Sequence, residues 1–200
     1  TVTKEREQGL AKRLADLGYA TITLDQRNLG AIDVNADLAL FIDGREPVEH
    51  MMVYDALSAA EVLRSVPEID PERIIYAGES NGARTAIIAC ALDERSKGVL
   101  ALSTCGYGTD AVVAQLGIED EDIIRFYRSI DPDTYLPLIA PRPLAMIHSR
   151  NDTVILYPLA VKTYALASQP KSLISVDCTV HGYCQEMDDG IEKGLKGMVS

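Results

Sequence analysis

The chain has 200 residues, which is long enough for one domain with a sizeable core, and its 47% hydrophobic and 24% charged residues are globular values. The formal net charge of −11 argues against nucleic acid and anionic membranes as partners, because both are negatively charged. The sequence contains no run of about 18 apolar residues, so we expect no membrane-spanning helix.

Segments with helical periodicity alternate with short β-branched, apolar runs along the chain. The ranges predicted to be helices are 4–17, 47–66, 84–92, 156–167 and 186–198, with one or two short helices within 110–138. The ranges predicted to be strands are 19–24, 73–77, 98–104, 144–148 and 172–178, and 31–46 is expected to be irregular. Because the strand runs are apolar on both faces, we predict an α/β protein with three layers, α/β/α, and a mostly parallel central sheet. No repeat or linker interrupts the pattern, so we treat 1–200 as one domain.

The G-E-S-N-G motif at 78–82 joins a predicted strand to a predicted helix. This is the context in which G-x-S-x-G forms a nucleophile elbow. The tight turn would strain the backbone of Ser80, and the two glycines would let the strand and the helix approach closely. Ser80 is therefore the candidate nucleophile, and the backbone N–H of Asn81 is the candidate oxyanion donor. An ordinary Gly-Ser turn is the competing interpretation.

A serine hydroxyl needs a base to become a good nucleophile, and the chain has three histidines. We expect His50, in the first turn of a helix, to be solvated or to act as a cap. We expect His148, at the end of a strand, to be structural. His181 lies in a polar loop between the last strand and the last helix, and it is the predicted base.

The predicted acid is Asp152, in the loop after the penultimate strand, and its role would be to orient the imidazole of His181. Asp177 is the rival, because it lies only four residues before His181. Taken alone, Asp152 could also cap the helix that follows it. Parallel strands present their carboxyl ends at one edge of a sheet, so Ser80, Asp152 and His181 are predicted to meet there.

The order Ser80, Asp152, His181, each after a strand, resembles the α/β-hydrolase superfamily. The stretches 10–19 and Asp25-x-Arg27-x-x-Gly30 also resemble this superfamily. The stretches 69–74 and Ala140-Pro141-Arg142-Pro143 resemble its dienelactone hydrolase-like and prolyl-oligopeptidase-like members. The resemblance covers nearly the whole chain. It implies a serine hydrolase that cleaves a carboxylic ester or similar acyl bond through an acyl-enzyme, without metal or cofactor.

The resemblance departs from the family at two places. Ala83 stands where the subgroup often has another glycine, a small change. The third strand of the family and its oxyanion loop precede the first helix, so we expect both to lie upstream of Thr1, and we expect this chain to lack the first strands of the fold. Without that strand, 19–24 and 73–77 would face each other across a gap of roughly 10 Å. A small cap segment is expected within 107–140.

Two alternatives stay open for the function. One is a peptidase of prolyl-oligopeptidase type, and the other is a non-catalytic binding protein with the same fold. We expect a small-molecule ester or acyl substrate, no nucleic acid or membrane partner, and a cytoplasmic location. The four cysteines lack metal-ligand spacing and are expected to be reduced, although Cys178 and Cys184, which flank His181, could be bridged in an oxidising compartment.

Overall fold

A computed structural model describes residues 8–27 and 31–199. Four strands in this part of the chain form one parallel sheet in the order β1-β2-β3-β4. They are β1 (Tyr76–Glu79), β2 (Val99–Leu102), β3 (Leu144–Ser149) and β4 (Lys171–Val176). In the register, Tyr76 lies opposite Val99, Val99 opposite Leu144, and Leu144 opposite Lys171.

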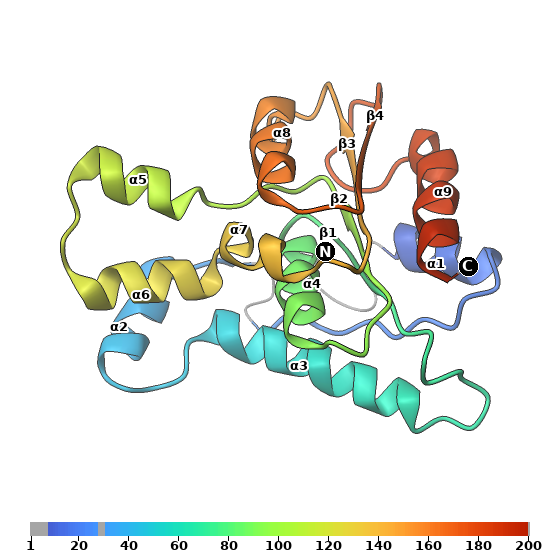
Figure 1. The fold of residues 1–200 in the computed structure, drawn as a ribbon, viewed down its shortest axis with the longest axis horizontal. Helices are drawn as coiled ribbons and strands as arrows, with labels where there is room; N and C mark the ends of the chain where they lie inside the picture. Colours follow the sequence, from blue (N-terminus) through green and yellow to red (C-terminus); the bar gives the residue numbers. More distant parts are fainter. Residues whose placement is uncertain (1–7, 28–30, 200) are drawn as a thin grey trace.

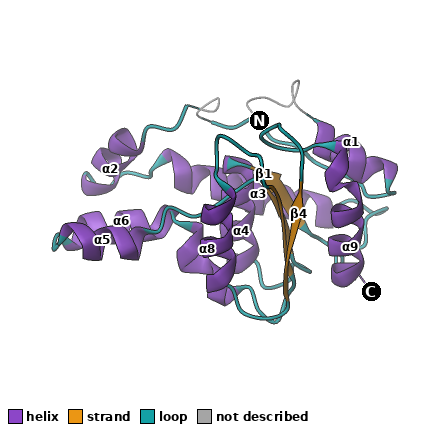
Figure 2. Cartoon of the chain, turned by 90° about the horizontal axis from the view of Figure 1, so that it is seen from above, coloured by secondary structure: helices purple, strands orange, loops and turns teal. Residues whose placement is uncertain are grey.

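Helices cover both faces of this sheet, as predicted (Figures 1 and 2). One face carries α3, α4 and α8, and the other carries α1 and α9. The α-helices are α1 (Gly9–Asp16), α2 (Val34–Ile42), α3 (Val48–Arg64), α4 (Asn81–Leu92), α5 (Thr109–Leu116), α6 (Glu121–Ile130), α7 (Pro132–Tyr135), α8 (Tyr157–Leu166) and α9 (Asp188–Val199); two 3₁₀ turns span Leu136–Leu138 and Gln185–Met187. Among the described helices, none combines the length and apolar character that crossing a membrane requires.

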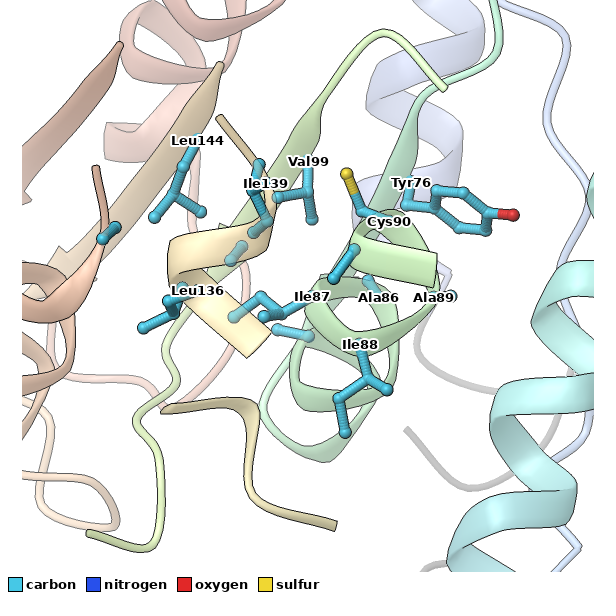
Figure 3. Packing of buried hydrophobic residues seen from close by; sticks show 14 of the residues in the cluster. Tyr76, Ala86, Ile87, Ile88, Ala89, Cys90, Val99, Leu136, Ile139 and Leu144 are labelled. Carbon is cyan, nitrogen blue, oxygen red and sulfur yellow. The ribbon is translucent and has the colours of Figure 1, made fainter. Parts of the chain in front are cut away.

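The core has two halves, one on each face of the sheet. Successive residues of a strand point to opposite faces, so in β2 Val99 packs towards α4 while Leu100 packs towards α9. Figure 3 shows the first half, where Ile87 of α4 lies near Val99 and Leu136. Burial on both faces is the reason why the inner strands β2 and β3 read as nearly continuous apolar runs.

The predicted strand at 19–24 is wrong: these residues form neither a strand nor a helix. The one backbone hydrogen bond that holds this segment among the described residues runs from the Tyr19 N–H to the Leu14 carbonyl, and most of the segment is exposed. A cavity of about 730 Å³ separates the segment from β1, and apolar residues of α1 and α3 also line it. A strand needs a hydrogen-bonding neighbour, and no described segment supplies one here.

The N-terminal part of the chain differs from the prediction in two further ways. The helix predicted for 4–17 is described from Gly9 onwards, and residues 4–7 lie outside the described ranges. The range 31–46, predicted to be irregular, contains α2. The Asp33 carboxylate caps this helix by accepting the N–H of Ala36. The buried Asp37 within α2 in turn caps α3, because its two oxygens accept the N–H groups of Val48 and Glu49.

Two helices, α5 and α6, extend away from the sheet side by side (Figures 1 and 2). They fall within the range 107–140, where the sequence predicts short helices. Arg128 on α6 pairs with Asp110 on α5, with 2.7 Å between Nε and Oδ1. Between them and β3, α7 and the 3₁₀ turn Leu136–Leu138 pack against α4, so this part of the connection belongs to the body of the molecule.

Candidate active site

The turn between β1 and α4 has the strained geometry that an elbow requires. Ser80 has φ 55° and ψ −123°, outside the regions that a non-glycine residue ordinarily adopts. A Cβ at Gly78 would lie 2.4 Å from the carbonyl oxygen of Gly82, so glycine is necessary at 78. A Cβ at Gly82 would meet nothing closer than 3.9 Å among the described residues, so the crowding comes from position 78 alone.

The side chain of Ser80 meets His181, and His181 meets Asp152. The Ser80 Oγ lies 2.8 Å from the His181 Nε2, and the His181 Nδ1 lies 2.8 Å from the Asp152 Oδ2. With the proton on Nδ1, the imidazole donates to Asp152 and accepts the hydroxyl proton of Ser80. The structure therefore brings together the three side chains that sequence analysis singled out, from the ends of β1, β3 and β4.

Asp152 is only 2% exposed, and its carboxylate is surrounded by donors. The backbone N–H groups of Val154 and Ile155 donate to Oδ1 at 2.8 and 3.0 Å, while His181 donates to Oδ2. Burial alone would raise the pKa of Asp152, but these hydrogen bonds outweigh it and hold the pKa below its ordinary value. The carboxylate consequently stays ionised beside the imidazole.

The rival acid and the other two histidines lie elsewhere. Asp177 is 66% exposed at its side chain and pairs with Arg150 at 3.7 Å, away from His181. His148 is buried and its Nε2–H donates to the Ile155 carbonyl; burial lowers its pKa, so it is neutral and structural, as expected. His50 is more than a solvated residue, because it bridges Glu46 and Ser129 at 3.0 and 2.7 Å and so links α3 to α6.

Asn81 is the first residue of α4, where a backbone N–H has no partner within the helix. No described residue accepts a hydrogen bond from this N–H, so it can bind an external acceptor beside the Ser80 hydroxyl. The side-chain amide of Asn81 is buried without a well-formed hydrogen bond to any described residue. The second oxyanion donor, expected upstream of the first helix, falls outside the described residues.

The prediction that all four cysteines are reduced is wrong for one pair. Cys178 and Cys184 form a disulfide that closes the loop carrying His181. Cys90 and Cys105 are buried free thiols, as expected, and burial raises the pKa of both. Within the described ranges, the cluster of potential metal ligands is Cys178, Cys184 and Glu186, and the disulfide already occupies both of its thiols.

Sequence analysis missed one further contact in the site. The Glu79 carboxylate, the variable residue before Ser80 in the motif, accepts the backbone N–H of Tyr183 at 2.6 Å. Tyr183 lies two residues beyond His181, so this contact joins the nucleophile turn to the histidine loop. The motif gives no signal for it, because the pairing spans 104 positions of sequence and depends on how the loop after β4 crosses the end of the sheet to reach β1.

Solved structures of esterases share this fold. Acetyl xylan esterase 1 from Thermoanaerobacterium sp. JW/SL YS485 aligns with a TM-score of 0.68 over 100% of this chain and 72% of that chain, at 13% identity. The esterase domain of a Rhodothermus marinus protein aligns with a TM-score of 0.60 over 94% of this chain and 75% of that chain, at 18% identity. The fold is that of the α/β hydrolases.

Sequence comparison places the chain within one family of that class. The model of the acetyl xylan esterase (AXE1) family matches residues 41–151, which are more than half of the chain. The chain therefore belongs to this family. The uncharacterized protein YfhR of Escherichia coli (strain K12) is 27% identical over 132 residues, which are 65% of this chain and 45% of YfhR. The chain spans about half the length of the curated relatives it matches.

Proposed function

We propose that the protein is a serine esterase in which Ser80, His181 and Asp152 form the catalytic triad. The observation that carries this proposal is the continuous hydrogen-bonded chain from the Ser80 Oγ through His181 to Asp152, with 2.8 Å at each step. Distances of this size are those at which a nucleophile and its base act together. Membership of the acetyl xylan esterase family supports the choice of an ester as substrate.

In the reaction, the Ser80 Oγ attacks the ester carbonyl while the His181 Nε2 takes its proton. Asp152 holds the imidazole in the tautomer with Nδ1 protonated, and it stabilises the imidazolium that forms. The N–H of Asn81 donates to the oxyanion of the tetrahedral intermediate. The imidazolium then protonates the leaving alcohol, and water, activated by the same histidine, hydrolyses the acyl-enzyme.

For the substrate we propose esters of short acyl groups, with acetyl esters first among them. The family description supports an acetyl group. The helices α5 and α6 are short, and we propose that they form the small cap expected within 107–140. A small cap would leave the site too open to enclose a long acyl chain. A cytoplasmic location stays a prediction, and the disulfide between Cys178 and Cys184 argues against it, because the cytosol keeps most thiols reduced.

The decisive experiment compares the wild-type protein with Ser80→Ala on p-nitrophenyl esters of rising chain length. We expect the wild type to prefer the acetate and Ser80→Ala to lose on the order of 10⁴-fold in rate with its fold intact. A Ser80→Ala variant that keeps its activity would end the proposal, and preference for a long-chain ester would refute the short-acyl part.

Labelling with a fluorophosphonate separates the esterase from a non-catalytic protein of the same fold. An activated serine reacts covalently with this reagent, so we expect one adduct on Ser80 in the wild type and none in Ser80→Ala. An intact protein that is folded and yet unlabelled would favour the binding protein. Cleavage of prolyl-peptide anilides without cleavage of esters would favour the peptidase of prolyl-oligopeptidase type.

A further inference from the structure

The loop 178–184, which carries His181, is anchored by three side chains that stand at the carboxyl ends of three different strands. Glu79 ends β1, Ser103 directly follows β2, and Ser149 ends β3. Each makes one hydrogen bond to the backbone of the loop. The place of the imidazole therefore depends on contacts with the sheet in addition to the hydrogen bond with the acid.

Two of these anchors act on the same peptide group. The Glu79 Oε2 accepts the N–H of Tyr183 at 2.6 Å, and the Ser103 Oγ–H donates to the carbonyl of Gly182 at 3.2 Å. That N–H and that carbonyl belong to the single peptide bond between Gly182 and Tyr183. This peptide bond lies one residue after His181. Because its N–H and its carbonyl are both hydrogen-bonded, rotation of the peptide plane would break both hydrogen bonds.

The carboxylate of Glu79 also fills the space directly against Gly182. A Cβ at Gly182 would lie 2.7 Å from the Glu79 Oε2, closer than such atoms approach in proteins. Gly182 has φ +97°, which a residue with a side chain rarely adopts. The positive φ is the reason why glycine is needed at 182, and the short distance to the Glu79 carboxylate shows how closely the loop approaches the residue that precedes the nucleophile.

We infer that Glu79 is a positioning residue for His181, acting through the Gly182–Tyr183 peptide, with Ser103 as the second half of the clamp. This inference rests on the proposed function, in which His181 is the base. Glu79 is bonded directly to Ser80, so one turn of backbone sets both the nucleophile and the loop that carries its base. Misplacement of a catalytic group by about 1 Å costs on the order of 10²-fold in rate, so the clamp matters for catalysis.

The test compares Glu79→Gln with Glu79→Met in hydrolysis of p-nitrophenyl acetate. Glutamine keeps a side-chain oxygen that can accept the N–H of Tyr183, while it loses the charge and carries an NH2 group in place of the second oxygen; methionine has similar length and no such acceptor. We expect Glu79→Met to lower kcat by about 10- to 100-fold with KM changed by less than about twofold. We expect Glu79→Gln to stay within about threefold of the wild type in kcat.

Two outcomes would overturn the inference. In one, Glu79→Met keeps the wild-type kcat; in the other, Glu79→Gln is as impaired as Glu79→Met, which would show that the charge, and not the hydrogen bond, is what matters. Ser103→Ala supplies an independent check. Since both side chains hold one peptide group, the effects of Glu79→Met and Ser103→Ala on kcat should be less than additive in the double variant, and full additivity would contradict a shared clamp.

Ser80→Ala keeps this inference separate from the proposed function. If Ser80→Ala retains its activity, the proposed function fails; if it loses its activity while Glu79→Met does not, only the positioning role fails. Should Glu79→Met not fold, Ser103→Ala alone tests the clamp from its other half, because it removes the hydrogen bond to the Gly182 carbonyl without straining the backbone of the loop. We expect a loss of kcat relative to the wild type, and an unchanged kcat would overturn the inference.

Discussion

At the scale of single residues, the site depends on Asp152 being both buried and ionised. The carboxylate is withdrawn from water, but two backbone N–H groups and His181 replace the lost hydration. Asp177 is nearer to His181 in sequence and yet points to solvent, where it pairs with Arg150. The sequence predicts Asp152 as the acid with Asp177 as its rival, and of the two only Asp152 contacts the imidazole in the structure.

We therefore expect Asp152→Asn to lower kcat/KM by about 10⁴-fold, because an amide can favour the wrong tautomer of His181. Asp177→Asn is the matched control and should leave the rate close to that of the wild type. Steady-state kinetics of the two variants on one ester decide the matter. A large loss in Asp177→Asn together with none in Asp152→Asn would reverse the assignment.

A second prediction for a single residue concerns Glu49 and the pH dependence of the free energy of unfolding. Burial raises the pKa of Glu49 from 4.5 to about 7, and the charge of Asp37 contributes to the rise, while Arg84 opposes both. At a pH between 4.5 and about 7, the Glu49 carboxyl has lost its proton in the unfolded chain but still carries it in the folded protein. The stability from the neutral carboxyl is therefore fully present below pH 4.5 and is lost as pH rises through 7.

Glu49→Gln removes this titration and should gain in stability relative to the wild type as pH rises. Urea unfolding at about pH 5 and about pH 8, on either side of the raised pKa, measures the free energy of unfolding of both proteins, with the exposed Glu94→Gln as control. A pKa difference of one between the folded and unfolded states corresponds to about 1.4 kcal/mol, so the effect should exceed the error of the measurement. An equal difference at both pH values would show that Glu49 does not titrate abnormally.

At the scale of elements, a disulfide closes the loop after β4 into a covalent ring. The disulfide between Cys178 and Cys184 joins residues six apart, and His181 lies midway between them. A ring of this size restricts the unfolded chain and stabilises the fold by about 2 kcal/mol on the loop-entropy estimate. The same ring restricts the loop that presents the imidazole to Ser80.

We expect the Cys178→Ser/Cys184→Ser variant to lose about 2 kcal/mol of the free energy of unfolding, measured in urea. Dithiothreitol should lower the stability of the wild type by a similar amount and leave the double variant unchanged, which makes the variant its own control. A wild type that does not respond to dithiothreitol, although its disulfide is shown to be reduced, would contradict a stabilising role for the bridge.

At the scale of the whole molecule, the outer edge of β1 faces a cavity instead of another strand. The Tyr76 N–H bonds to the Gly98 carbonyl on the β2 side, so by alternation the N–H of Ala77 points the other way, towards the cavity. Within the described ranges no backbone group pairs with Ala77 on that side. The cavity of about 730 Å³ and the segment at 19–24 that lines it lie beyond it.

We propose that a further polypeptide strand pairs with the outer edge of β1 in this cavity. Hydrogen exchange followed by NMR or mass spectrometry tests this directly. If a strand is present, the Ala77 amide should exchange as slowly as that of Gly78, its neighbour in β1, because both would be hydrogen-bonded. Rapid exchange at Ala77 beside slow exchange at Gly78 would show that the edge of β1 is open to solvent.

The sequence by itself determined the layers and the candidate triad, because both depend on local patterns. Apolar runs that alternate with helical periodicity require a parallel sheet covered on both faces, and G-x-S-x-G between a strand and a helix requires an elbow at Ser80. Since parallel strands end at one edge, the order of Ser80, Asp152 and His181 was enough to predict that they meet. Local signals failed for α2, whose Asp33 cap was not recognised, and placed β1 about three residues too early.

What only the tertiary structure decided depends on contacts between segments far apart in the chain. The sequence favours Asp152 over Asp177, but the hydrogen bond from His181 to Asp152, and the pairing of Asp177 with Arg150 instead, exist only in the fold. The hydrogen bond from Tyr183 to Glu79 and the bridge between Cys178 and Cys184 require the folded loop. The segment at 19–24 has the composition of a buried strand, but a strand exists only where a neighbour accepts its hydrogen bonds, and that is a property of the assembled sheet.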